Sequence, residues 1–403
     1  MNSFPPPDDT AWTKWQSAWS LRPDTVYLNH GSFGPPPDVV RAARRRWIDR
    51  LDEQPMEYFI RDYEDLLRDA REKLAGFVGA GEGNLIFVEH ATMAMNILAG
   101  SFPLGTGDEV LLTDHEYGAV DRIWDRACEQ VGARRITATL PARFTSSEEV
   151  VEAIFRKVTD RTRLIVVSHV TSPTAIILPV EPICRRARQQ NVRVCIDGPH
   201  AVAMLPLDLT ALDCDYFTAS CHKWLCAPFG SGFFYVHPRV QQEIKPLAIS
   251  WGRSPPLPLD HWGDEFIWTG TRDQSALLTI PTAIDFLRGV PFDAFRARYR
   301  YLIRYAREQV TELTGLAPYV GVDMDNGDMD DGAKWCGSMI ALPLSPGEAR
   351  PLQQALWLRY RIEIPVIDWH GGRHVRVSCH LYNTTQQIDR LVDALRELLR
   401  QNL

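Results

Sequence analysis

The sequence predicts an α/β protein with a large, doubly wound, mainly parallel seven-stranded sheet and a smaller C-terminal α+β domain. Three observations lead to this prediction. The chain has 403 residues, enough for more than one domain with a full core. From Leu85 onward, short β-rich apolar runs alternate with helical patterns. Beyond about residue 281, a long helical pattern leads into a second set of strands and helices.

The seven expected strands of the large sheet are short and apolar. They cover residues 85–88, 109–112, 135–138, 164–167, 192–196, 216–220 and 232–236. Helical patterns lie between most of them, as they do between parallel strands joined by crossover helices. Residues 232–236 follow the preceding strand without room for such a helix, so we expect this last strand to run antiparallel.

The remaining elements divide the chain into three parts. Asp8 or Asp9 can cap a first helix in which Trp12, Trp15 and Trp19 share one face. We expect residues 1–28 to form an N-terminal helical segment on the small domain, residues 29–280 the large domain, and residues 281–403 the small domain. Helices are expected at 38–51, 57–78, 281–314, 347–359 and 385–399, and small-domain strands at 338–342, 362–367 and 374–378.

Composition excludes several classes of protein. The apolar fraction of 45%, the charged fraction of 24% and the net charge of −7 are ordinary for a soluble globular protein. The basic run from Arg41 to Arg46 is followed by acidic residues, so we interpret it as a solvated helix face and expect no nucleic-acid partner. The eight cysteines form no Cys-x-x-Cys pair, which favours packed thiols over disulfides or a metal site. Neither a signal peptide nor an apolar stretch of membrane-spanning length is recognisable, so we expect a cytoplasmic protein.

The strongest functional signal lies at the ends of two expected strands. Residues 216–220 lead directly into Cys221-His222-Lys223-Trp224, and residues 192–196 lead into Asp197. A lysine among apolar neighbours has a lowered pKa, so its free amine can form a Schiff base with a carbonyl. An aspartate can hold the proton on a pyridine nitrogen. Together these groups predict pyridoxal phosphate, bound at the carboxyl ends of the strands.

Two further positions have both a functional and a structural interpretation. Thr92 begins a helix after the strand at 85–88, where backbone amides suit a phosphate group, although a plain helix cap explains it nearly as well. Tyr117 follows the second strand and could stack on a flat cofactor or be a packed core residue.

Several motifs, in this order, resemble those of class V aminotransferases, and among them the isopenicillin N epimerase-like branch. They are Asn29-His30-Gly31-Ser32-Phe33-Gly34, Glu89-His90-Ala91-Thr92, Asp114-His115-Glu116-Tyr117-Gly118-Ala119, Ser168-His169-Val170-Thr171-Ser172-Pro173-Thr174, Asp197-Gly198-Pro199-His200, Ser220-Cys221-His222-Lys223-Trp224, Gly270-Thr271-Arg272-Asp273 and Arg376-Val377-Ser378. The resemblance covers nearly the whole chain. It is specific for the superfamily and the cofactor, and much less so for the substrate.

The resemblance implies a role for each matching residue. Lys223 would form the Schiff base with the cofactor, Asp197 would hold its pyridinium, His200 would contact its ring hydroxyl, and Tyr117 would stack on its ring. The other cofactor-binding positions, mainly around the phosphate, would be Ala91, Thr92, Ser172, Ser220, His222 and Thr271. Relatives supply the residue at the Thr271 position from the neighbouring subunit, so the resemblance implies a homodimer with shared sites. Arg376, Asn29 and His30 would bind an amino-acid-like substrate, with a structural ion pair as the competing interpretation of Arg376.

The reaction itself stays open at this point. Lys223, Asp197 and Tyr117 would act at Cα of an amino acid, and the fate of the carbanion would decide between an epimerase, a C–S β-lyase and an aminotransferase. Cysteine desulfurases carry a catalytic cysteine just before the arginine region. Residues 364–373 contain none, so a persulfide mechanism is disfavoured. A binding protein that keeps the fold without turnover is the remaining alternative.

Overall fold

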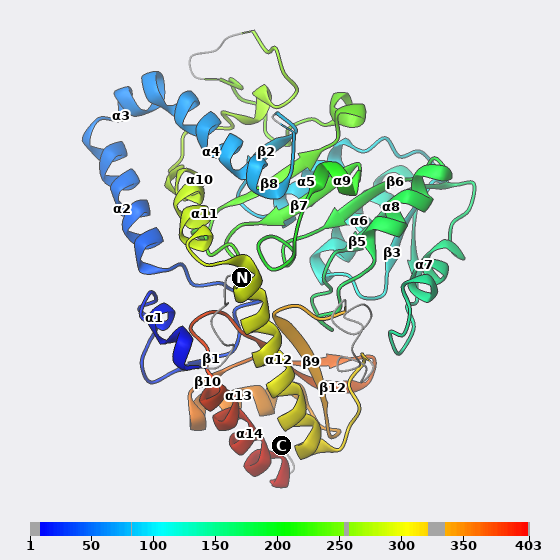
Figure 1. The fold of residues 1–403 in the computed structure, drawn as a ribbon. Coiled ribbons are helices and arrows are strands. Elements are labelled where there is room, and N and C mark those ends of the chain that lie inside the picture. The colour runs from blue at the N-terminus through cyan, green and yellow to red at the C-terminus, as the bar shows by residue number, and fades with distance from the viewer. Residues whose placement is uncertain (1–8, 82, 254–257, 321–334, 402–403) are drawn as a thin grey trace, which may run out of the picture.

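The computed structural model describes residues 9–81, 83–253, 258–320 and 335–401. A seven-stranded sheet with helices on both sides forms one part of the molecule, and a smaller sheet with its own helices lies below it in the view of Figure 1. These two sheets are the ones expected from the sequence.

The large sheet has the strand order β2-β8-β7-β6-β5-β3-β4. Its strands are β2 (Leu85–Val88), β3 (Glu109–Thr113), β4 (Arg134–Ala138), β5 (Thr162–Ser168), β6 (Arg193–Asp197), β7 (Tyr216–Ser220) and β8 (Gly232–Val236). The neighbouring strands β4, β3, β5, β6 and β7 pair in parallel. Strand β8 is antiparallel to both of its neighbours, β7 and β2. The prediction of a mainly parallel sheet with an antiparallel last strand is therefore confirmed.

Alternate residues of the sheet strands other than β4 enter two separate cores. In β5, Ile165 and Val167 belong to one apolar cluster, and Leu164 and Val166 belong to the other. Helices α4 (Tyr63–Val78), α8 (Val180–Gln189) and α11 (Ile280–Arg288) pack into the first cluster, and helices α5 (Ala91–Ser101) and α6 (Gly118–Val131) into the second. Because both faces are covered, the strands are largely continuous apolar runs, as is typical of parallel sheets, whereas the edge strand β4 is partly exposed.

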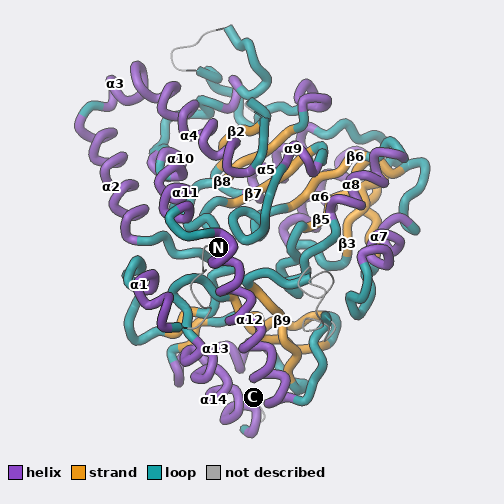
Figure 2. Tube along the Cα trace, in the orientation of Figure 1, coloured by secondary structure: helices purple, strands orange, loops and turns teal. Residues whose placement is uncertain are grey.

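Figure 2 shows how the helices surround both sheets. Their bounds are α1 (Thr13–Gln16), α2 (Asp38–Glu53), α3 (Pro55–Glu57), α4 (Tyr63–Val78), α5 (Ala91–Ser101), α6 (Gly118–Val131), α7 (Ser147–Phe155), α8 (Val180–Gln189), α9 (Leu209–Leu212), α10 (Ser275–Leu278), α11 (Ile280–Arg288), α12 (Phe292–Thr314), α13 (Ala349–Tyr360) and α14 (Thr385–Arg400). A π-helical turn, Tyr58–Asp62, joins α3 to α4 inside the helix expected at 57–78.

The small sheet contains three antiparallel strands in the order β11-β12-β9. They are β9 (Met339–Leu344), β11 (Val366–Trp369) and β12 (Gly372–Ser378). The single strand expected at 362–367 is wrong, because β10 (Ile362–Glu363) ends before Pro365 and pairs elsewhere. Proline has no N–H for a strand ladder, so the chain changes partner at this point.

The continuous helix expected at 281–314 is also wrong. Helix α11 ends at Arg288 and α12 begins at Phe292. Between them, Pro291 disfavours the helical conformation for the residue before it and cannot donate a helical hydrogen bond. The break lets α11 pack against α2 and α4 while α12 packs on β9 of the small sheet.

The N-terminal segment is less helical than the tryptophan spacing predicts. A 3₁₀ turn at Thr10–Trp12 continues into α1, which ends at Gln16, so Trp19 lies outside the helix. Asp9 makes no capping bond to this turn; its carboxylate pairs with Arg298 and accepts from Thr385 instead. Asp8 lies outside the described residues. The bounds of the three domains stay a prediction.

Strand β1 (Val26–Tyr27) ties the N-terminal segment to the C-terminal part of the chain. It pairs in parallel with β10, and Asn29 bridges to Ser378 at the end of β12. All eight cysteines are buried and none is part of a disulfide. Among the described residues, no helix is both long enough and apolar enough to span a membrane.

Candidate active site

Three neighbouring strands end in polar side chains at the same edge of the large sheet. Ser168 ends β5, Asp197 ends β6 and Ser220 ends β7, and Ser168 is directly paired with Asp197. They face a cavity of about 390 Å³ that lies against this edge. Ten of the thirteen predicted site residues line it, namely Ala91, Thr92, Tyr117, Ser172, Asp197, His200, Ser220, His222, Lys223 and Arg376.

Lys223 reaches the cavity from the turn that follows β7. Its Nζ lies 3.0 Å from Nε2 of His200, while Nδ1 of His200 accepts a hydrogen bond from the indole N–H of Trp224 at 3.2 Å. Burial, with a smaller contribution from the charge of Arg376, lowers the pKa of Lys223 to about 7. Burial also lowers the pKa of His200 well below its usual value, so the ring is neutral. Since Trp224 occupies Nδ1, Nε2 carries the proton and donates to the free amine of Lys223.

Asp197 lies on the floor of the cavity. The Thr218 hydroxyl donates to its Oδ1 at 2.6 Å, and the side chain is almost fully buried. Burial raises the pKa of Asp197, although the Thr218 bond and the nearby Lys223 charge oppose the shift. A buried carboxylate of this kind gains stability from a cationic partner, which a pyridinium N–H supplies. Gly198 follows, and a Cβ there would lie 2.0 Å from Cζ of Phe217.

The N-terminus of α5 forms one wall of the cavity. His90 caps the helix through its Nδ1, which accepts from the Met93 amide at 3.1 Å, and the Ala91 amide donates to Ser220 Oγ at 3.0 Å. Thr92 lies inside the first turn, so it is not the cap and its side chain lines the cavity. Helix N-termini attract anions through free amides and the helix dipole.

His222 completes this polar wall. Its Nδ1 is buried and has no hydrogen-bond partner among the described residues. Burial lowers the pKa of His222 to about 4, against the opposing effect of a hydrogen bond to the Ser231 backbone, so the imidazole is neutral. An unpartnered buried nitrogen costs free energy unless a polar ligand group satisfies it, so this nitrogen marks the wall as a place for such a group.

Arg376 enters the cavity from β12 of the small sheet. One guanidinium nitrogen donates to the carbonyl and, at 3.2 Å, to the hydroxyl of Ser172, and the other donates to Ser32 Oγ at 2.8 Å. The side chain is 5% exposed and has no carboxylate partner among the described residues, so the ion pair considered from the sequence is not formed. Burial lowers the pKa of Arg376 to about 10, which still leaves it charged at neutral pH.

Tyr117 lies at the mouth of the cavity and is 50% exposed. It directly precedes α6, and its exposure rules out the packed core position considered from the sequence.

Glu116, beside Tyr117, points the other way into the protein. Its two carboxyl oxygens lie 2.6 Å from the hydroxyls of Thr113 and Ser168, and burial raises its pKa to about 8.

Three predicted site residues do not line the cavity. Thr271 is exposed, next to Arg272, which pairs with Glu89 just before α5. Asn29 donates to Glu363 at 3.4 Å, beside the two-stranded sheet. His30 is fully buried behind Lys223, where it contacts the backbone of the lysine.

Sequence reasoning assigned no role to Ser32, Ser168 and Glu116. Ser168 could have been found, because it directly follows the strand predicted at 164–167, just as Asp197 follows the strand predicted at 192–196. Ser32 lies in a glycine-containing motif, but its contact with Arg376 joins distant parts of the chain. Nothing in the local sequence distinguishes Glu116 from an exposed acid.

The residues present fit pyridoxal phosphate. A buried lysine amine of lowered pKa, a buried aspartate and a helix N-terminus with an unpartnered histidine nitrogen all face the same cavity. These are the groups that an aldehyde, a pyridine nitrogen and a phosphate require.

Comparison with known proteins places the chain in a family. Residues 56–391 match the family model described as "Aminotransferase class-V". The isopenicillin N epimerases of Amycolatopsis lactamdurans and Streptomyces clavuligerus are 36% and 34% identical to the chain; each alignment covers 96% of the chain, and 99% and 98% of the relatives. The structure of the cystine C–S lyase C-DES in complex with cysteine persulfide has the same fold, with a TM-score of 0.78 and 21% identity over 93% of this chain and 98% of that one. The chain therefore belongs to the class V aminotransferase family.

Proposed function

We propose that the protein binds pyridoxal phosphate through Lys223 and moves a proton at Cα of an amino acid or amino-acyl compound, as an epimerase. One observation carries the proposal: a lysine amine whose pKa is lowered to about 7, an arginine with no carboxylate partner among the described residues and a half-exposed tyrosine share the cavity. The full-length similarity to isopenicillin N epimerases supports this reaction within the family.

When bound, the cofactor withdraws electrons from the bonds at Cα and so acidifies the Cα proton. Asp197 keeps the pyridine nitrogen protonated, because its own charge is stabilised by that proton. Thr92, Ser220 and His222 would hold the phosphate, and His200 would turn its single Nε2 proton from the lysine amine to the ring oxygen.

Arg376 binds the substrate carboxylate through the guanidinium that Ser172 and Ser32 orient. Lys223 then takes the proton from Cα as a free amine, a role that suits a pKa of about 7. Tyr117, at the solvent side of the cavity, returns a proton from the opposite face. Proton removal by one group and return by another inverts the configuration.

We further propose that the sites are completed in a homodimer. Thr271 is exposed and outside the cavity of its own chain, which suits a contact with the phosphate in a second copy. The molar mass in solution, measured by light scattering, tests the dimer, and mixed dimers of Thr271→Ala and Lys223→Ala chains test the sharing of residues.

The experiment that tests the reaction is exchange of the Cα proton in deuterated water, followed by NMR over a panel of amino acids and amino-acyl compounds. We expect exchange with appearance of the opposite configuration. Lys223→Ala should abolish both this exchange and the visible absorbance, whereas Lys157→Ala, at an exposed position, should leave both unchanged.

Three results would contradict the proposal. Release of pyruvate and ammonia would assign a β-elimination, and transfer of the amino group to a 2-oxo acid would assign an aminotransferase. A wild-type protein that never acquires visible absorbance with pyridoxal phosphate would refute the role of Lys223.

A further inference from the structure

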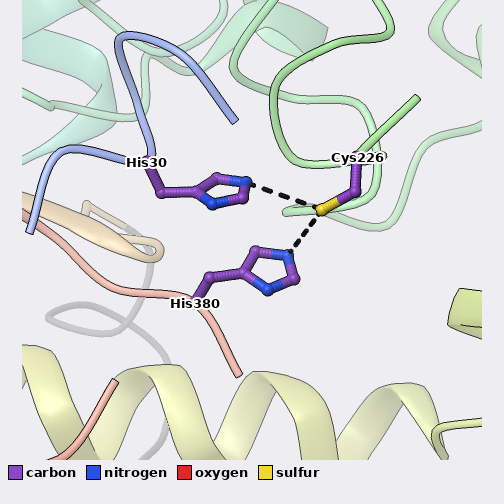
Figure 3. A group of neighbouring side chains, drawn as sticks. All are labelled: His30, Cys226 and His380. Atoms are coloured by element: carbon purple, nitrogen blue, oxygen red, sulfur yellow. Dashed lines mark hydrogen bonds between the residues drawn. The ribbon is translucent and has the colours of Figure 1, made fainter. Parts of the chain in front are cut away.

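Two histidines and a cysteine form a buried cluster behind the active-site lysine. His30 follows β1, His380 follows β12, and Cys226 lies three residues after Lys223. All three side chains are fully buried. Figure 3 shows both imidazole rings directed at the thiol, with Nε2 of His30 3.7 Å and Nε2 of His380 3.3 Å from the sulfur. The cluster is outside the cavity lining.

The hydrogen bonds of His30 fix the position of its proton. Its Nδ1 lies 2.9 Å from the hydroxyl of Tyr382, and its Nε2 lies 3.1 Å from the carbonyl oxygen of Lys223. Burial lowers the pKa of His30 to about 3, so the ring carries one proton. A carbonyl oxygen only accepts, so Nε2 carries that proton and donates it to Lys223, while Tyr382 donates to Nδ1. The Tyr382 hydroxyl thereby fixes the tautomer of His30.

Other backbone groups also hold the turn that contains Lys223. The amide of Cys226 also donates to the Lys223 carbonyl, at 2.9 Å, and the Gly34 amide donates to the His222 carbonyl at 3.1 Å. A Cβ at Gly34 would lie 2.4 Å from the Lys223 oxygen, so the segment after His30 packs directly on the lysine. Cys226 has a φ of +57°, a conformation that only the surrounding contacts can stabilise.

One stretch of the small sheet links this cluster to the cavity. Arg376 enters the cavity from β12, and His380 and Tyr382 lie just beyond the end of that strand. The His380 ring stacks on His30, with centroids 4.1 Å apart. The segment that presents the substrate-binding guanidinium therefore also holds the lysine from behind.

We propose that His30 is a positioning residue for the amine of Lys223, and that Tyr382 is the group that keeps it in the donating tautomer. This inference rests on the proposed function of the cavity. His30 fixes the lysine at its carbonyl and His200 contacts it at Nζ, so the amine keeps one direction towards the reacting carbon. A displacement of about 1 Å at such a group costs up to about 100-fold in rate.

The three side chains could instead be ligands of a metal ion, since their donor atoms lie within 4.8 Å of one another. The hydrogen bonds favour positioning. The Nε2 proton of His30 is used by the lysine carbonyl, and a metal would have to displace it and also deprotonate Cys226, whose pKa burial raises well above its usual value.

The test compares Tyr382→Phe with Tyr299→Phe. Both changes remove one hydroxyl from a buried tyrosine of the same aromatic cluster, but the Tyr299 hydroxyl has no hydrogen-bond partner among the described residues. We expect Tyr382→Phe to lower kcat for Cα exchange about tenfold and to leave KM within about twofold, because Arg376 is unchanged. Tyr299→Phe should leave both parameters close to wild type. His30→Gln, which keeps an N–H donor, should retain more activity than His30→Phe.

A second measurement does not depend on turnover. Cofactor-free protein is mixed with pyridoxal phosphate, and the rate at which visible absorbance appears is recorded, together with amide hydrogen exchange across residues 221–226. Tyr382→Phe should slow the appearance of visible absorbance and speed the amide hydrogen exchange of residues 221–226. Tyr299→Phe should change neither rate. Equal rates in the two variants would overturn the positioning role. The positioning role would also be overturned if the wild type bound one equivalent of metal tightly and Cys226→Ser did not bind it. If the wild type itself acquires no absorbance, the proposed function fails first.

Discussion

Glu116→Gln is the substitution whose effect can be worked out most directly from the structure. Glu116 is 4% exposed, and its carboxyl oxygens contact the hydroxyls of Thr113 and Ser168. Burial raises its pKa from 4.5 to about 8; the two hydroxyl contacts oppose this shift, and the charge of Asp197 adds to it. Glutamine has nearly the same shape and both hydrogen-bonding functions, but it does not titrate.

The direction of the effect follows from proton linkage. Between the unfolded pKa and the folded pKa, the folded chain binds one more proton at Glu116 than the unfolded chain does. The free energy of unfolding contributed by this group is therefore fully present below about pH 4.5 and is lost as the pH rises through about 8. The loss approaches about 1.4 kcal/mol per pH unit, or about 4 kcal/mol between pH 5 and pH 8.

The assay is urea unfolding of the wild type and Glu116→Gln at pH 5, 6, 7 and 8. We expect the variant to gain stability relative to the wild type with each step in pH. Glu148→Gln, at an exposed position on α7, serves as the control and should follow the wild type. Parallel curves for wild type and Glu116→Gln across this range would show that Glu116 is ionised in the folded protein, and the reasoning from its burial would be wrong.

Three other predictions concern the cavity. Competitive acylation of Lys223 in the cofactor-free protein, read by mass spectrometry, should rise with pH around a midpoint near 7, and a midpoint near 10 would contradict its burial. Arg376→Lys should raise KM for the amino-acid substrate at least tenfold, because an ammonium group cannot bind a carboxylate in two places; an unchanged KM would remove Arg376 from the substrate site. Gly198→Ala should lower the free energy of unfolding by about 1–3 kcal/mol, measured by urea denaturation, because the new Cβ meets the ring of Phe217; an unchanged midpoint would contradict this contact.

The positions of Asp197, Ser220 and Lys223 could be predicted from the sequence because they depend on local order alone. Parallel strands expose their carboxyl ends at one edge, so residues that follow such strands meet there whatever the strand order is. The same argument reaches Ser168. It requires only that each strand be recognised, and the apolar runs of a doubly covered sheet are easy to recognise.

His30 and Arg376 could be connected with the site only through resemblance, because their positions depend on pairing between distant segments. His30 lies behind the lysine because β1 pairs with β10 and carries the following residues under the lysine turn. Pro365 redirects the chain before β11, and no periodicity in the sequence shows which strand each half would join. Long-range pairing of this kind decides whether a polar residue faces the cavity or the protein interior.

The choice between an epimerase and a lyase rests on Tyr117 more than on Lys223. In the proposed function, Lys223 and Asp197 would serve both reactions, since each begins with removal of the Cα proton. Inversion needs a second proton donor on the opposite face, and Tyr117 is the half-exposed hydroxyl at the cavity mouth. Tyr117→Phe should therefore suppress inversion about 10²-fold or more while Cα exchange with retention continues, and Tyr360→Phe, on α13 outside the cavity, should change neither. Chiral analysis of the deuterated product separates these outcomes. Inversion at the wild-type rate in Tyr117→Phe would transfer the role to another donor, because a water molecule or a partner residue would then have to supply the proton.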